Sequence, residues 1–123
     1  MARYVDGFVL PILKKNIATY RKIANNAGKI WREHGALEYR ECVIEDADPA
    51  GPMSMITFPK LAKVKKGEVV VFAWIVYKSR AHRDRVNKKV MADPRMMQGF
   101  DPKNPPFDCR RMSYGGFDVL VDR

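Results

Sequence analysis

The sequence predicts an α+β domain with the element order strand, helix, strand, strand, helix, strand. This is the ferredoxin-like βαββαβ pattern, an antiparallel sheet with both helices on one face. Two neighbouring segments carry the prediction. Glu68–Tyr77 is apolar on both faces and rich in β-branched and aromatic side chains, as expected of a central strand. Arg80–Val90 follows after Lys78 and Ser79, with the apolar spacing of a basic helix.

The first strand is expected at Tyr4–Leu10, and Pro11 is expected to end it. An unusual feature of this strand is a charged residue at its middle. By the period of two, Asp6 lies on the same side as Tyr4 and Phe8.

A long helix is predicted over Leu13–His34, because apolar residues recur at steps of four and three. They are Leu13, Ile17, Tyr20, Ala24, Ala27 and Trp31. Gly35 follows the helix directly, as a left-handed C-terminal cap would. Asn16 is a candidate N-cap, although no capping box supports it.

The second strand is predicted at Ala36–Ile44 and has polar residues on both faces, which is typical of an edge strand or of the lining of a wet cavity. An acidic, proline-containing loop follows at Glu45–Pro52. We expect a short extra strand at Met53–Phe58 and a helical turn at Pro59–Val64. The chain then turns into the central strand.

The second helix is expected to start after Ser79, whose hydroxyl can cap the first turn, and to stop near Asp93–Pro94. Arg95–Asp108 is rich in proline and is expected to be irregular. The last strand is predicted at Cys109–Val121. Within it, the pair Gly115–Gly116 indicates a bulge or a close backbone approach.

Both helices of this arrangement cover the same sheet face, so the second face needs another cover. Trp74 and its apolar neighbours would otherwise form a large exposed patch, which monomeric proteins avoid. A twofold homodimer with the two open faces packed together solves this problem. We therefore expect the partner of this chain to be a second copy of itself.

Length and composition indicate one domain, residues 1–123, without a metal or disulfide staple. Two cysteines, Cys42 and Cys109, favour a cytosolic protein with reduced thiols. No apolar segment has the length of a signal sequence or a membrane span, so we expect a cytoplasmic protein without membrane contact. No cofactor-binding fingerprint is present, and we expect no cofactor and no metal.

The net charge of +9 raises the question of nucleic-acid binding. The 23 Lys and Arg residues are spread over both helices, a turn and the C-terminal region. Such a spread favours solvated surfaces over a single binding face. Nucleic-acid binding is therefore ranked last among the functions considered.

Six residues are candidates for a small-molecule cavity. They are Asp6, Tyr39, Glu41, Trp74, His82 and Tyr114. Trp74 and the tyrosines would stack an aromatic or quinone-like ligand, and His82 or Asp6 would move a proton. Each has a structural alternative.

His82 is more simply a partly buried histidine bonded near the helix start, and His34 a partner of the helix dipole. The strand carboxylates, Asp6 among them, could instead pair with an arginine such as Arg40 or Arg111.

Four segments resemble the YbaA-like family of small bacterial proteins of unknown function. They are Tyr4–Pro11, Trp31–Cys42, Phe72–Val86 and Arg111–Phe117. That family is similar in fold to the dimeric α/β-barrel group, which includes antibiotic biosynthesis monooxygenases. The resemblance implies the homodimer, and it implies no reaction, because the family itself has none assigned. The fold shared with the monooxygenases does not supply one either, since one fold serves many chemistries.

The residues together favour a homodimeric barrel protein that binds a small organic molecule between sheet and helices. Cofactor-free oxygenation or isomerisation is the chemistry that such a cavity would suit. The alternative is a stress-associated structural or binding protein without catalysis, whose cavity is filled by its own side chains. Whether the chain is an enzyme stays open.

Overall fold

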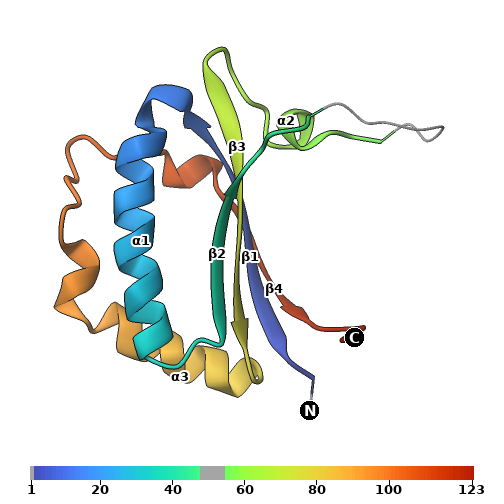
Figure 1. The fold of residues 1–123 in the computed structure, drawn as a ribbon, viewed down its shortest axis with the longest axis vertical. Coiled ribbons are helices and arrows are strands. Elements are labelled where there is room, and N and C mark those ends of the chain that lie inside the picture. Colours follow the sequence, from blue (N-terminus) through green and yellow to red (C-terminus); the bar gives the residue numbers. More distant parts are fainter. Residues whose placement is uncertain (1, 48–54) are drawn as a thin grey trace.

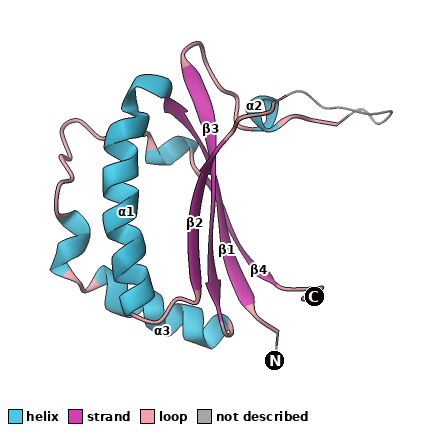
Figure 2. Cartoon of the chain, in the orientation of Figure 1, coloured by secondary structure: helices cyan, strands magenta, loops and turns pink. Residues whose placement is uncertain are grey.

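In the computed structural model, which describes residues 2–47 and 55–123, four strands form one antiparallel sheet in the order β2-β3-β1-β4. The strands are β1 (Tyr4–Leu13), β2 (Glu38–Val43), β3 (Glu68–Tyr77) and β4 (Ser113–Asp118). Helices α1 (Ile17–Glu33) and α3 (Arg80–Met91) lie on one side of the sheet, and the short α2 (Phe58–Leu61) lies on the other (Figures 1 and 2). The predicted α+β fold with βαββαβ order is confirmed.

Strand β3 is central and has the predicted bounds. Val71, Ala73, Ile75 and Tyr77 alternate along it and are buried beneath the helices. On the opposite face, Phe72 is exposed. Strand β3 thus has apolar side chains on both faces, as predicted. In a single chain the two long helices cover only one of these two faces (Figure 1).

Helix α1 packs the predicted apolar stripe against the sheet. Tyr20 and Ala24 are buried with residues of β1 and β3, and Trp31 packs on the second part of the core. The helix is shorter than predicted, since Leu13 ends β1 and a 3-10 turn precedes Ile17. Gly35 follows with a φ of 116°, as the predicted left-handed cap requires.

The prediction that Pro11 ends the first strand is wrong, because β1 continues to Leu13. Strand β4 pairs with β1 only as far as Val9, so at Pro11 one side of β1 has no neighbouring strand. A residue without an N–H is tolerated at such a position. The extra length brings Pro11 and Ile12 against β3, and both are buried.

The extra strand predicted at Met53–Phe58 is also wrong where it can be compared. Met55–Thr57 has no regular structure, and Phe58 begins α2 with Thr57 as its N-cap. Met53 and Ser54 lie outside the described residues, as does part of the acidic loop. The predicted helical turn after Pro59 corresponds to α2.

The last strand is shorter than the predicted Cys109–Val121. Residues Cys109–Arg111 form a 3-10 turn, and the residues after Asp118 leave the sheet. Gly115 and Gly116 pair with β1 in regular register, without a bulge. The close approach is real, because a Cβ at Gly116 would lie 2.4 Å from the hydroxyl of Tyr4.

Helix α3 starts and stops where the sequence predicts. The Ser79 hydroxyl accepts a hydrogen bond from the His82 N–H at 3.1 Å, and the helix ends at Met91, before Pro94. The chain from 92 to 112 then runs beside α1 to β4 (Figure 1). Within the described residues, no helix combines the length and apolar character needed to cross a membrane.

Candidate functional site

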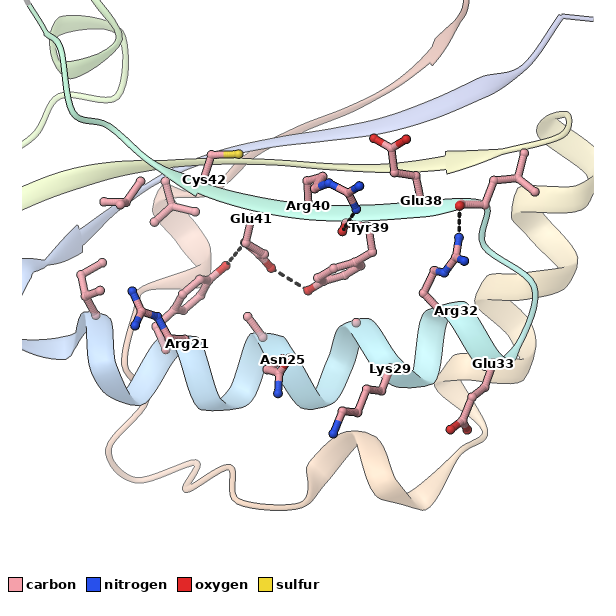
Figure 3. Close-up of a pocket in the computed structure, with 17 residues that line it drawn as sticks. Arg21, Asn25, Lys29, Arg32, Glu33, Glu38, Tyr39, Arg40, Glu41 and Cys42 are labelled. Atoms are coloured by element: carbon pink, nitrogen blue, oxygen red, sulfur yellow. Dashed lines mark hydrogen bonds between the residues drawn. The ribbon is translucent and has the colours of Figure 1, made fainter.

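A groove of about 790 Å³ lies between α1 and the edge strand β2 (Figure 3). A smaller apolar chamber of about 210 Å³ lies further inward, between α1 and the sheet. Four residues line both hollows: Tyr20, Ala24, Tyr39 and Glu41. These residues therefore form the boundary between an outer, polar groove and an inner, apolar chamber.

The alternation of β2 explains why this boundary is polar. Tyr39 and Glu41 pair with Ile75 and Ala73 of β3, whose side chains are buried beneath the helices. The alternate residues, such as Glu38 and Cys42, point to the other side of the sheet (Figure 3). From the sequence, polar residues on both faces of this strand indicate either an edge strand or the lining of a wet cavity. Strand β2 is both, since it lies at the edge of the sheet and its residues Tyr39 and Glu41 line the two hollows.

Glu41 is held by two phenols. The hydroxyl of Tyr20 donates to Oε1 at 2.7 Å, and the hydroxyl of Tyr39 donates to Oε2 at 2.6 Å. Burial, together with the charge of Glu41, raises the pKa of both tyrosines far above the ordinary value, so both remain neutral donors. The result is a carboxylate fixed in position, with one donated hydrogen bond on each oxygen.

The inner chamber is otherwise apolar. Besides the boundary residues it is lined by Phe8, Leu10, Ile23, Ala27, Trp31, Ala73, Ile75, Met96, Phe107 and Met112. Met96, Phe107 and Met112 come from the segment between α3 and β4. Asn16, just before α1, donates a hydrogen bond to the Pro106 carbonyl of this segment, and Asn26 of α1 donates to the Arg95 carbonyl. That irregular segment therefore provides one wall of the chamber.

A second polar cluster surrounds Asp6 between β1, β4 and α3. Arg83 donates to Asp6 Oδ1 at 2.8 Å, and Tyr114 donates to the same oxygen at 3.0 Å. The Arg83 guanidinium also lies over the Tyr4 ring, with its Cζ 5.0 Å from the centroid. Asp6 is 2% exposed, so this is a buried ion pair closed by a phenol.

The partner suggested for Asp6 from the sequence is corrected by this geometry. Arg83 takes that place instead of Arg40 or Arg111. Arg111 donates twice to Glu68, at 2.6 and 2.9 Å, and Arg40 donates to the backbone carbonyl of Tyr39. The hydrogen bonds from Arg111 lower the pKa of Glu68.

His82 lies at the start of α3 in a structural setting. Its Nδ1 accepts the Lys78 N–H at 3.0 Å, and its ring meets Tyr77 edge to face with centroids 6.1 Å apart. Burial and then the charges of Lys78, Arg85 and Lys89 lower the pKa of His82, which favours the neutral ring. This arrangement matches the structural alternative for His82.

Trp74 lies on the sheet face away from α1 and α3. Its indole Nε1 donates to Glu38 at 2.9 Å, and its ring is 5.5 Å from that of Phe72. The six candidates therefore occupy four places: Tyr39 with Glu41, Asp6 with Tyr114, and His82 and Trp74 each alone. No single cavity gathers them.

Two central residues were missed from the sequence, Tyr20 and Arg83. Tyr20 belongs to the apolar stripe of α1, where a phenol is indistinguishable from any core aromatic until Glu41 is placed opposite it. Arg83 is one of three arginines on α3, and only the position of Asp6 opposite it distinguishes it from the others.

Within the described residues, no three His, Cys, Asp or Glu side chains come together as a metal site would require. Both cysteines are free.

Residues 3–109 match the family described as "Protein of unknown function (DUF1428)". The chain is 40% identical over 120 residues to "Uncharacterized protein YbaA" of Escherichia coli strain K12, with 98% of each chain covered. The protein of the same name from Shigella flexneri matches equally well. Among solved structures, "De novo designed protein Foldit4" aligns with a TM-score of 0.47 at 9% identity, covering 95% of this chain and 98% of that one.

Proposed function

This chain belongs to the DUF1428 family, whose description states no function, and we propose that it binds a small organic molecule in the chamber between α1 and the sheet. The observation that carries the proposal is the position of Glu41. It is the one charged side chain among the described residues lining the inner chamber, and it also lines the outer groove. An apolar chamber with a few fixed polar groups is the usual form of a ligand site.

The fixed carboxylate suits proton transfer without a cofactor. Glu41 would remove a proton from a carbon next to a carbonyl of the ligand, becoming a neutral acid while the ligand becomes an enolate. Return of the same proton to a different carbon completes an isomerisation, in which nothing is oxidised or reduced. The neutral hydroxyls of Tyr20 and Tyr39 hold the carboxylate throughout. Isomerisation is therefore the enzymatic form of this proposal.

A homodimer through the open sheet face is the second part of the proposal. Phe58, Phe72 and Phe117 expose large apolar surface there or at its margin, with Phe117 58% exposed. Strand β2 contributes one negative and one positive side chain to this face, Glu38 and Arg40, so their charges cancel. The chain as a whole, in contrast, has a net charge of +9. A face that is apolar and nearly neutral matches a second copy of itself across a twofold axis.

Native mass spectrometry of protein taken gently from its host tests both parts. We expect a mass of two chains with a retained organic molecule. In Ala24→Leu, the larger side chain enters the boundary between groove and chamber, and the molecule should be lost. Ala18→Leu on the exposed face of α1 is the matched control and should retain it.

Retention of the same molecule by folded Ala24→Leu would contradict the site. An empty protein that also fails to bind any added small molecule would instead favour a non-catalytic structural role, with the chamber filled by its own side chains.

A further inference from the structure

The charged groups around the outer groove are unevenly satisfied. Three carboxylates line it, and each has a partner: Glu33 pairs with Arg95 at 2.8 Å, Glu38 accepts from Trp74, and Glu41 accepts from two tyrosines. Only Glu33 meets an opposite charge, whereas Glu38 and Glu41 keep their negative charge on neutral donors.

Four cations line the same groove, one more than its carboxylates: Arg21, Lys29, Arg32 and Arg40. Arg32 donates to the carbonyls of Ala36 and Leu37, and Arg40 donates to the carbonyl of Tyr39, so both are bonded to neutral groups. In the described part of the chain, neither Arg21 nor Lys29 forms an ion pair or a hydrogen bond. The charge left available to a ligand is therefore positive.

Arg21 is the cation best placed for such a ligand. It follows Tyr20 directly in α1, and its side chain extends on the side of the helix that faces β2, at the end of the groove where Glu41 lies (Figure 3). A guanidinium presents two parallel N–H donors that match a carboxylate. An anionic head group in the outer groove would thus meet Arg21, whereas the side chain of Lys29, further along α1, extends away from β2 (Figure 3).

We propose that the ligand is an amphipathic organic carboxylate, with an aromatic or similarly apolar body in the inner chamber and its carboxylate in the outer groove against Arg21. This inference rests on the proposed ligand-binding function and adds the chemical class. The apolar wall of Phe8, Trp31 and Met96 takes the body, and the unpaired Arg21 takes the head. Glu41 then faces the junction between the two parts of the ligand, where a carbon next to a carboxylate or carbonyl would lie.

The test compares three probes of the same ring system: 2-naphthoate, the neutral 2-naphthylmethanol and the cationic 2-naphthylmethylammonium. Dissociation constants are measured by isothermal titration calorimetry on the full chain. We expect the carboxylate to bind tightest, by roughly tenfold over the alcohol, which corresponds to ~1.4 kcal/mol. Because exposed charges are screened by salt, raising the ionic strength should narrow this difference.

Two variants, each of which removes one positive charge from α1, show which residue causes the preference for the carboxylate. Arg21→Gln should abolish the preference for the carboxylate and leave binding of the alcohol unchanged. Lys22→Gln is the matched control, since Lys22 is exposed on the same helix and does not line the groove. It should preserve the preference, and circular dichroism should show both variants folded.

Equal binding of the carboxylate and the alcohol by the wild type, or tighter binding of the ammonium, would overturn the inference and leave the proposed function intact. So would an equal loss in Arg21→Gln and Lys22→Gln, because that result assigns the preference to net charge alone. Failure of all three probes to bind the folded protein would overturn both the inference and the proposed function.

Discussion

The ring of Tyr39 on β2 lies directly against Gly28 on α1. A Cβ built at Gly28 would be 2.8 Å from Tyr39 Cδ1 and 3.0 Å from Cε1, closer than carbon atoms approach without displacement. The absence of a side chain at this one helical position therefore leaves room for the Tyr39 ring, whose hydroxyl bonds to Glu41. Helix, strand and candidate site are connected through this contact.

Gly28→Ala is accordingly expected to destabilise the protein, by about 1 to 3 kcal/mol, because the ring must move. This result is opposite to the ordinary gain of a Gly to Ala change inside a helix. Urea unfolding measures the difference. Asn25→Ala, at an exposed position of the same helix, is the control. It should not destabilise the protein by more than a few tenths of a kcal/mol, because Ala is the better helix former. A Gly28→Ala variant more stable than the wild type would show that Tyr39 is free to move.

Asp6→Asn is expected to cost roughly 3 to 5 kcal/mol of folding free energy, because it removes the buried counter-charge of Arg83, a side chain that is only 12% exposed. Asp84 also contacts Arg83, at 2.7 Å, but its side chain is 60% exposed. Asp84→Asn should therefore change the stability by no more than about 1 kcal/mol. Chemical denaturation of both variants measures the contrast, and similar values for the two would mean that burial does not distinguish these two ion pairs.

His82 is expected to titrate below its ordinary pKa of about 6.5. Since the folded state holds the proton less tightly than the unfolded state, His82 contributes stability above pH 6.5, and this contribution is lost as the pH falls through the lower pKa of the folded state. The chain has two histidines, so ring-proton NMR can follow each, and His82→Asn identifies the signal.

The same variant provides the control for the stability measurement. The unfolding free energy of the wild type should fall more steeply than that of His82→Asn as the pH is lowered below about 6.5. A His82 signal that titrates above 6.5 would contradict the assignment of a neutral, Nδ1-accepting ring.

Phe72→Glu is expected to convert the proposed dimer into monomers, because it places a charge at the centre of the open sheet face. Sedimentation velocity at several concentrations measures the mass. Met91→Glu alters an equally large exposed apolar residue at the end of α3, on the helix side, and should leave the mass unchanged. Phe72→Glu protein that is folded and still sediments as the wild type does would exclude this face as the interface.

Periodic segments of the chain were predictable because their signal is local. The bounds of β3 follow from a continuous run of β-branched and aromatic residues, which favours a strand. Ser79 and Gly35 mark the ends of helices through the conformation or the capping hydrogen bond of a single residue. Pro11 misled the prediction for the opposite reason. Whether a proline is tolerated depends on the absence of a neighbouring strand on one side of β1, which is a property of the sheet.

The candidate site divides in the same way. Sequence alone determined the α+β order, an apolar second sheet face, and polar residues on β2, since these follow from alternation and composition. Only the tertiary structure decided that Glu41 meets Tyr20 and Tyr39, that Asp6 pairs with Arg83, and that Trp74 lies on the opposite face. The physical reason is that a hydrogen bond between residues distant in the chain depends on register and helix packing, which no single segment encodes.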